Sequence, residues 1–571
     1  MTSLNGISVA LQALLTQSAS LDIINHNVAN ANTSGYHRQE AVLMAGPTQG
    51  TPGFVNSTVI SQIGTGVVLT DIKRYNDNFA DIRYRAEVAS SSRWATTTNV
   101  LSQVESLEDE TSEDGMSTKL DEFWTSWKDV SDDPQDTALR SALLESASQL
   151  CDAFHTRYAG LMQIQADLDN TVIQDVQEIN TLATQVAQLN AEISRYATSS
   201  TQKNDFLDQQ EIYLDRLSEL AGAKITFEPN GMAMVSIGGH MLVQGTQTIQ
   251  LTTVTNTSNS NLKDIMWVDG QEFNPTNGEL YGVMDVRDNI IEEEKTSLNN
   301  LAATIFNAVN SVHRQGYGLN DVTPAATGGS AMIGGSIITS GSIIEGGSIV
   351  GGSIVGGSVV GSYPEYTYAS GSANPVGRDF FVVDGDTGYE SGWDENGNPT
   401  GSTNIYPSMI NLALSISINP DIESDVNNIA AAMNPDASGD NSLAEDIYAM
   451  AGDSVTLKQV NTGYPGNGGS ALIDLLNSEG TAISENINDY NSQRVTELSL
   501  TIQRAETMQS QHESLLTALT TDRESVSGVS LDEEAAELIK YQRSYQAAIR
   551  MMTAVDDMLD RVINGMGKVG L

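Results

Sequence analysis

Cysteine is almost absent from this chain. Of 571 residues only Cys151 is a cysteine, so neither an intramolecular disulfide nor a cysteine-based metal site is possible. Cys151 falls in an apolar helical stretch, and we expect it to be a core residue. Aromatic residues are also scarce, at 6%. A chain of this length and composition favours several domains built from long helices and polar-faced sheets over one large apolar core.

Basic residues are few as well. The chain has 28 Lys and Arg against 73 Asp and Glu, for a formal net charge of −45. A phosphate backbone would repel such a surface, so no nucleic-acid partner is expected. The charge is uneven, because residues 1–90 carry −1 and residues 484–571 carry −6. Nearly neutral ends suit packing among copies of the chain, whereas general acidity in a salt-tolerant organism would explain only the magnitude.

Long apolar runs and an N-terminal basic segment are missing too. No uninterrupted apolar run reaches the ~18 residues typical of a membrane-spanning helix. We therefore expect no membrane insertion. Residues 1–31 contain no Lys or Arg, so the basic region of a secretory signal is absent. If the protein leaves the cell, we expect a route that cleaves no such signal.

Enzyme signatures are also absent. None of the six histidines is spaced for a metal pair. His512-Glu513 begins a zincin-like motif, but Leu516 stands where the second histidine is needed. Paired carboxylates occur throughout an acidic chain and single out no catalytic dyad. We expect no enzyme activity, no cofactor and no metal.

What the sequence does contain is an amphipathic helix at each end. Residues 3–30 have an a/d heptad pattern, with Ser3 as a plausible N-cap and turn residues after Asn30. Polar residues at two a positions would fix register more than strength. The a positions are Leu4, Leu11, Ser18 and Asn25, and the d positions are Ile7, Leu14, Leu21 and Val28.

The C-terminal segment has the same pattern over five heptads. Ser530 and Glu533 form a capping box after the helix breaker Gly528. Acidic residues in the first turn suit the helix dipole. The a positions are Leu531, Leu538, Tyr545, Met552, Leu559 and Met566, and the d positions are Tyr541, Ala548, Val555 and Val562.

Neither terminal helix can bury its apolar stripe alone. We expect the two to pair with each other or with helices of neighbouring subunits. An ordinary helical hairpin that closes a globular domain would give the same pattern.

The middle of the chain alternates between helical and strand-like segments. Residues 46–70 suggest short strands or an extended connector, and residues 75–220 are mostly helical. Residues 222–284 alternate in strand fashion around glycine turns. Residues 285–315 and 441–525 return to helix.

A low-complexity segment interrupts this order at residues 328–362. Units such as Gly346-Gly347-Ser348-Ile349-Val350 repeat there with a period of five. The pattern favours an inserted hairpin or irregular β loop with weakly specified register. Recent repeat expansion is the favoured explanation of the segment, over a function of its own. Residues 363–430 are turn-rich and predict a small β domain.

Two terminal motifs resemble a known family. The segment Asn25-His26-Asn27-Val28-Ala29-Asn30-Ala31-Asn32-Thr33-Ser34-Gly35-Tyr36 is similar to the N-terminal signature of flagellar rod, hook and hook-associated proteins, and His37-Arg38-Gln39 extends the likeness to the hook-associated members. Ser530-Leu531-Asp532-Glu533-Glu534 through Tyr541-Gln542-Arg543-Ser544-Tyr545-Gln546-Ala547-Ala548 resembles their C-terminal signature.

Internal motifs strengthen the resemblance to hook-associated proteins. They include Phe123-Trp124, Asp133-Pro134 with Arg140, and Asn204-Asp205-Phe206-Leu207-Asp208-Gln209. The likeness covers roughly residues 1–320 and 435–571. Residues 328–430 depart from the family pattern.

The resemblance implies a mainly α fold with β insertions in a nested, multi-domain architecture. A coiled-coil-like core domain would combine residues 1–45 and 526–571. A helical middle domain would combine residues 46–325 and 435–525, with a β-rich part near 222–284. A small outer β domain would occupy residues 326–434, with the repeat inside it.

The resemblance also implies a structural role in the bacterial flagellum, joining hook to filament. Expected partners are copies of the chain in a ring, the hook protein, a second junction protein on the filament side, and an export chaperone on the C-terminal helix. Secretion through the flagellar type III apparatus would follow a transient cytoplasmic stage. Another axial subunit, of hook or distal rod, and a secreted adhesin-like surface module remain alternatives.

The expected assembly interface consists mainly of apolar heptad residues. Gly35 and Tyr36 would turn the chain outward, although for Gly35 alone a simple helix stop is the favoured interpretation. The predicted residues are Leu4, Ile7, Leu11, Leu14, Leu21, Val28, Asn30, Thr33, Gly35, Tyr36, Leu531, Leu538, Tyr541, Tyr545, Met552, Val555, Leu559 and Val562.

Overall fold

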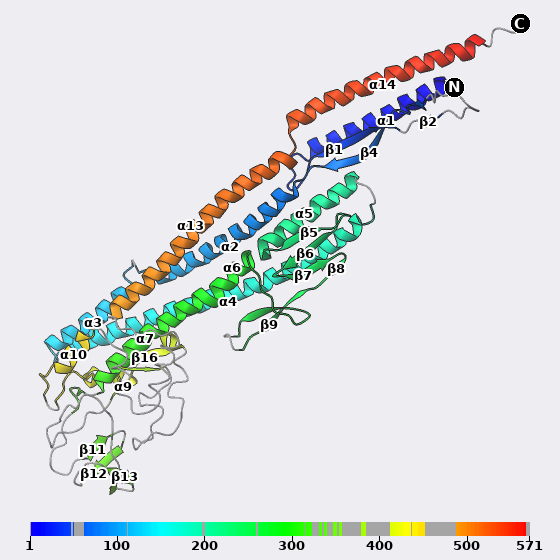
Figure 1. Cartoon of the computed structure of the whole chain (residues 1–571). Coiled ribbons are helices and arrows are strands. Elements are labelled where there is room, and N and C mark those ends of the chain that lie inside the picture. The colour runs from blue at the N-terminus through cyan, green and yellow to red at the C-terminus, as the bar shows by residue number, and fades with distance from the viewer. Residues whose placement is uncertain are drawn as a thin grey trace. The chain divides into compact units, whose positions relative to one another are not determined.

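The computed structural model divides the chain into two compact units (Figure 1). Unit 1 comprises Met1–Thr98, Asp169–Met284 and Ala505–Leu571, and unit 2 comprises Asn99–Leu168 and Asp285–Arg504. The structure describes residues 2–46, 49–50, 62–110, 112–196, 200–257, 261–314, 316–321, 330–333, 336–339, 347–350, 353–356, 378–383, 411–434, 437–451 and 487–566.

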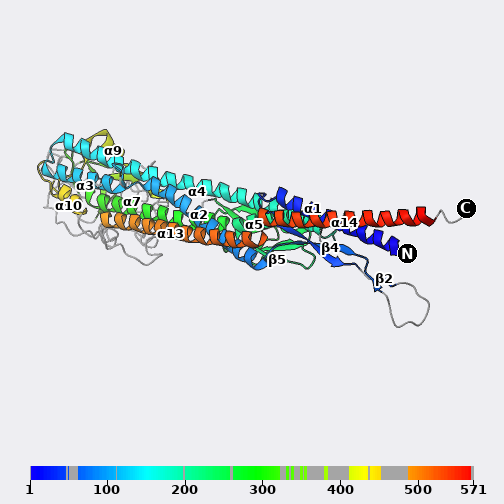
Figure 2. The same ribbon diagram turned by 90° about the horizontal axis from the view of Figure 1, so that it is seen from above.

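The two terminal helices pack together in unit 1. Helix α1 spans Thr2–Ala29 and helix α14 spans Leu531–Met566, and they lie side by side in both views (Figures 1 and 2). The two backbones come close at Gly6, where an added Cβ would lie 3.4 Å from Val555 Cγ2. The predicted pairing of the chain ends is therefore confirmed.

Most of the predicted helix boundaries agree with the structure. Helix α1 ends next to Asn30, as predicted. Ser530 caps α14, since its Oγ accepts the Glu533 N–H at 3.5 Å. The Gly528 break separates α13 (Ile487–Ser527) from α14. The predicted N-cap at Ser3 is wrong, because α1 begins at Thr2 and serine is tolerated inside a helix at small cost.

A β-hairpin packs against α1. Strand β1 (Gln39–Ala45) pairs antiparallel with β4 (Val67–Arg74), with a bulge between Val42 and Leu43. The short strands β2 (Gln49–Gly50) and β3 (Gln62–Ile63) extend this pairing. The expectation of short strands near residues 46–70 is thus met at both edges of that segment.

Further helices complete the helical part of unit 1. They are α5 (Thr201–Ala221), α6 (Glu279–Asp285) and the parts of α2 (Asn78–Glu108) and α4 (Thr137–Ile193) that fall in this unit, together with the later part of α13. Ser200 caps α5 by accepting the Lys203 N–H, and Gly222 ends it with φ 60°.

The strand-like region near 222–284 forms small antiparallel sheets. A four-stranded sheet has the order β5-β6-β7-β8, and β9 pairs with β10. Asn190 of α4 fixes the larger sheet, because its Nδ2 donates to the carbonyls of Ala233 and Gly245 at 2.8 and 2.6 Å. The strands are β5 (Lys224–Phe227), β6 (Ala233–Ile237), β7 (His240–Gln244), β8 (Gln247–Thr248), β9 (Leu251–Thr255) and β10 (Lys263–Trp267).

Unit 2 is built around aromatic side chains. Trp127 and Phe123 of α3 (Met116–Asp132) pack against Phe380, with Trp127 and Phe380 ring centroids 5.3 Å apart. Cys151 of α4 belongs to the same core, as expected. The other described helices of the unit are a π-helical turn (Val286–Ile290), α7 (Ile291–His313), α8 (Leu412–Ser415), α9 (Pro420–Ser424), a 3-10 turn (Val426–Asn428), α10 (Ser442–Ala449) and the start of α13.

Arg140, which belongs to one of the internal motifs, is a buried structural residue of unit 2. Its Nε and Nη2 both donate to the Pro134 carbonyl, and its Nη1 donates to the Ile429 carbonyl at 2.7 Å. Burial lowers its pKa to about 10. The motif therefore ties the α3–α4 turn to the segment before α10.

The described parts of residues 326–434 only partly resemble an independent outer domain. In the repeat, β11 (Ser330–Ile333) pairs with β12 (Ser336–Thr339), and β13 (Gly347–Val350) pairs with β14 (Ser353–Gly356). However, β15 (Phe381–Val383) and β16 (Ile416–Ile418) contribute buried residues to the unit 2 core. The three-domain division remains a prediction beside the two observed units.

Candidate functional site: the terminal helices and the turn after α1

The predicted apolar stripe of α1 is divided between buried and exposed positions. Ile7, Leu14 and Leu21 are half-buried, while Leu11 and Val28 are 47% and 44% exposed. The fully buried side of α1 includes Ala10, Ile23 and Ile24, which lie outside the predicted heptad positions. The side chain of Leu4 lies outside the described residues.

The stripe of α14 follows the heptad prediction more closely. Its d positions Tyr541 and Val555 are buried, together with Ala548. Of the a positions, four are half-buried and Leu531 is exposed. The side chains of the last a and d positions, Met566 and Val562, lie outside the described residues. The four half-buried a positions are Leu538, Tyr545, Met552 and Leu559.

Further large apolar side chains remain exposed beside these positions. Leu15 of α1 is 61% exposed, and Met551 and Met558 of α14 are 51% and 56% exposed. Met551 and Met558 are seven residues apart, so they lie on one face of the helix. Pairing α1 with α14 therefore leaves apolar surface uncovered on both helices.

Helix α1 also meets a length and composition test for a membrane span. The segment Gly6–Ala29 has a mean hydropathy of 1.4 in its most apolar window, although no uninterrupted apolar run suggested this. A single apolar helix near the N-terminus does not by itself indicate a membrane span. Its buried polar residues Thr16, Ser20 and Asn27 make hydrogen bonds inside unit 1.

The turn after α1 is held by side chains of the helix itself. Asn30 Nδ2 donates to the His26 carbonyl at 3.0 Å, and exposed Thr33 donates to Asn30 Oδ1 at 3.2 Å. The Tyr36 hydroxyl donates to Asn27 Oδ1 at 2.8 Å and accepts from His26 Nδ1 at 3.0 Å. Burial and the nearby Asp208 raise the pKa of Tyr36, so its hydroxyl stays protonated.

Gly35 is required by both conformation and space. Its φ is +75°, and an added Cβ would lie 2.6 Å from Ile212 Cγ1 of α5. The residue is therefore more than a helix stop, because it allows the turn to pack closely on α5.

Asn27 is a functional candidate that the heptad pattern missed. It is 1% exposed, and its Nδ2 donates to the Gln39 carbonyl at 2.8 Å and to Glu534 Oε2 at 3.0 Å. Its Oδ1 accepts the Gln39 N–H at 3.0 Å. Glu534 is equally buried, and its Oε1 accepts a hydrogen bond from Arg38 Nε at 2.7 Å. These bonds join the end of α1 to the start of α14.

A buried group of ion pairs follows directly at His37. His37 is 2% exposed, and its Nδ1 and Nε2 lie 3.0 and 3.1 Å from carboxylate oxygens of Asp208 and Glu211. Arg74 of β4 pairs with both carboxylates, at 2.6 and 3.0 Å. Burial alone would raise the pKa of Glu211, but Arg74 outweighs burial and holds it at about 2.

The same group continues into α2 and α13. Arg523 pairs with Asp81 at 2.9 Å, with Asp215 at 2.7 Å and with Glu211 at 3.3 Å. Arg85 pairs with Asp215 at 2.6 Å. Burial and the charge of Glu211 raise the pKa of Asp81. Four further segments of unit 1, namely α2, β4, α5 and α13, thus meet around the turn after α1.

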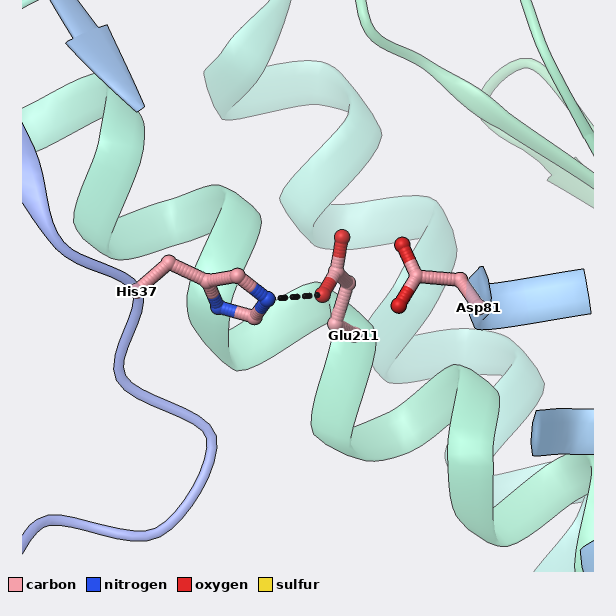
Figure 3. Close-up of side chains that lie close together, drawn as sticks. All are labelled: His37, Asp81 and Glu211. Carbon is pink, nitrogen blue, oxygen red and sulfur yellow. Dashed lines mark ion pairs between the residues drawn. The ribbon is translucent and has the colours of Figure 1, made fainter. Parts of the chain in front are cut away.

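Figure 3 shows three members of this group, His37, Asp81 and Glu211, with the Glu211 carboxylate between the other two side chains. Their ligand atoms lie within 4.8 Å of one another. No other such group of His, Cys, Asp and Glu is found among the residues that the structure describes. Sequence spacing could not reveal it, because the three residues are far apart in the chain.

A polar groove of about 790 Å³ borders the same turn. It is lined by residues 31–38 and by the α13–α14 connection, with Tyr84 and Arg523 among its walls.

Three family patterns match the chain. Residues 101–329 match "Flagellar hook-associated protein FlgK helical domain". Residues 7–37 match "Flagella basal body rod protein", and residues 523–565 match "Flagellar basal body rod FlgEFG protein C-terminal". The two terminal matches cover most of α1 and α14 and the turn between α1 and β1.

Whole-chain relatives carry one common name. Flagellar hook-associated protein 1 of Bacillus subtilis (strain 168) is 26% identical over 568 residues, which are 99% of each chain. The protein of the same name from Salmonella typhimurium is 25% identical over 98% of this chain and 99% of its own. That from Escherichia coli (strain K12) is 24% identical with the same coverage.

A solved structure, that of the flagellar hook junction protein FlgK from Burkholderia pseudomallei, covers 78% of this chain and 100% of its own, with 15% identity and a TM-score of 0.49. Together, the whole-chain relatives and the three matched patterns show that this chain is similar over nearly its whole length to flagellar hook-associated protein 1, a structural, non-enzymatic component of the bacterial flagellum.

Proposed function

We propose that this chain joins the flagellar hook to the filament, and that the outer face of the α1–α14 pair is its assembly surface. Its neighbours would be copies of itself in a ring, hook protein on one side and a second junction protein on the other. The matched relatives are named for association with the hook, which supports this assignment.

The observation that carries the proposal is the apolar surface left after pairing. Leu11, Leu15 and Val28 on α1 and Ile549, Met551 and Met558 on α14 are between 42% and 61% exposed. Fully burying one such side chain stabilises by roughly 1.5–3 kcal/mol. Several of them on two adjacent helices therefore favour association with further helices of the same kind.

The apolar surface of the terminal helices is also compatible with export of the chain in an unfolded state. A long amphipathic helix without a partner gains little stability of its own in water. The terminal segments can therefore remain unfolded during a transient cytoplasmic stage and during passage through a narrow channel, with a chaperone covering the apolar face of α14. Ordering at the assembly site is then offset by burial of that face.

The experiment compares two substitutions that each add one negative charge to α14. Met558→Glu places it on the exposed apolar face, and Gln546→Glu places it at an exposed polar position. Losing one buried methionine at the interface costs about 1.5 kcal/mol or more, so incorporation should fall at least about tenfold. Counting filaments per cell in a complemented deletion strain measures this.

Gln546→Glu should restore filaments to the wild-type number. Normal incorporation of Met558→Glu would contradict the proposed surface. Equal loss in both variants would show that added charge alone, and not the apolar face, is responsible.

A further inference from the structure

We propose that His37, Asp81 and Glu211 form a binding site for a divalent first-row transition metal ion, with Zn²⁺ as the probe. The three residues come from the turn after α1, the start of α2 and the middle of α5, all in unit 1. This inference is independent of the proposed assembly surface.

Two polar atoms in this group are buried without a hydrogen-bond partner. They are His37 Nε2 and Asp81 Oδ2. His37 Nε2 lies 3.1 Å from Glu211 Oε2, but without the geometry of a hydrogen bond. Buried polar atoms are nearly always bonded in native proteins, so two orphans facing the same carboxylate indicate a missing ligand.

The surroundings of His37 suit a metal ligand. Its Nδ1 lies 3.0 Å from the Gly35 carbonyl and 3.0 Å from Asp208 Oδ1, so an Nδ1–H has an acceptor. Metal-ligating histidines typically donate the other ring N–H to a carbonyl or carboxylate in this way. The tautomer leaves the Nε2 lone pair directed at the carboxylates. Arg74 Nη2, which already pairs with Glu211 Oε2 at 3.0 Å, also approaches Nδ1 at 2.8 Å and would have to turn away from Nδ1.

Arginines pair with both carboxylates. Arg74 Nη1 donates to Glu211 Oε1 at 3.0 Å, and Arg523 Nε pairs with Asp81 Oδ1 at 2.9 Å. Asp81 Oδ2 remains for the ion. Glu211 Oε2 also lies 3.0 Å from Arg74 Nη2 and 3.3 Å from Arg523 Nη2, so it would exchange an arginine contact for the ion.

The group as a whole has an excess of negative charge that a bound cation would balance. Four carboxylates face three guanidinium groups, so the group carries one excess negative charge when His37 is neutral. The carboxylates are Asp81, Asp208, Glu211 and Asp215, and the arginines are Arg74, Arg85 and Arg523.

A mixed set of one imidazole and two carboxylates suits zinc and its neighbours better than calcium or magnesium. Zinc–ligand distances of about 2.0–2.2 Å place ligand atoms roughly 3–4 Å apart. The observed 4.8 Å limit therefore requires the side chains to close by about 1 Å. A bound ion would fasten the turn after α1 to α2 and α5.

The test uses the full chain, stripped with EDTA, loaded with ZnCl₂ and desalted. We expect one zinc ion per chain by elemental analysis and a melting temperature raised by several degrees, because an ion that binds only the folded state stabilises it. His37→Gln and Asp81→Asn should each abolish both effects. His512→Gln is the matched control, because His512 pairs with Glu87 at 2.6 Å in unit 1 without a third ligand.

Cobalt substitution of the unaltered chain gives a readout that does not depend on any variant folding. We expect visible absorption bands of Co²⁺ with nitrogen and oxygen ligands at one equivalent. Absence of stoichiometric zinc and of these bands would overturn the site. Zinc retained equally by His37→Gln would show an adventitious ion only and would also overturn it.

Discussion

At the scale of single residues, Asn27 connects the two ends of the chain through three hydrogen bonds at 2.8–3.0 Å to Gln39 and Glu534. Asn27→Ala leaves buried polar groups on both partners without a bond. We expect the free energy of unfolding of unit 1 to fall by about 2–3 kcal/mol. Hydrogen exchange should accelerate at Gln39 and in the first turn of α14.

The control for this prediction is Asn25→Ala, two positions earlier on the exposed side of α1. It should change the unfolding free energy by less than about 0.5 kcal/mol. Equal effects of the two substitutions would show that the link between the termini does not depend on Asn27.

Asp175 gives a prediction about pH. Burial, reinforced by Glu279, raises its pKa from 3.8 to about 7. The folded chain therefore binds this proton more tightly than the unfolded chain, and the stability contribution falls as pH rises from about 4 to 7. Asp175→Asn should raise the unfolding free energy by about 1–2 kcal/mol at pH 8, with no gain below pH 4. Urea unfolding across this range checks the trend, and a gain that does not vary with pH would contradict it.

At the scale of elements, the heptad pattern predicted α1, α14 and their pairing because apolar periodicity and caps are local signals. It did not predict which apolar residues would pair inside one chain, since Leu11 and Val555 both belong to the predicted stripes but only Val555 is buried. The His37 group was beyond sequence reasoning, because its members meet only through the packing of α2, β4, α5 and α13. Asn27 and Glu534 lay inside the terminal motifs, but neither was among the residues to which the heptad pattern assigned a packing or register role.

The contact between α14 and α1 can be tested with a charged residue placed inside it. Val555→Asp places a charge where α14 meets Gly6, so the helix pair should separate and the terminal helices should lose helical signal. We expect a loss of about 3 kcal/mol, seen as faster proteolysis of both termini. Asp556→Asn on the exposed side is the control. Unchanged protection of α1 in Val555→Asp would contradict the intramolecular pairing.

At the scale of the whole molecule, the sequence predicted that both chain ends belong to one structural unit and that the middle is mainly helical. Unit 1 indeed contains both termini, and unit 2 comes from the middle of the chain. The separate outer domain remains a prediction, and the apolar residues of the segments around Phe381 and Ile416 contribute to the aromatic core of unit 2. Turn-rich composition indicates surface loops but does not show which apolar residues between the loops are buried elsewhere.

Electron microscopy of the source bacterium with this gene deleted would show whether the chain is required between hook and filament. We expect cells with bare hooks and unassembled flagellin in the medium, and restoration of filaments by the unaltered gene. Intact filaments on the deletion strain would contradict the junction role and would favour an accessory surface role.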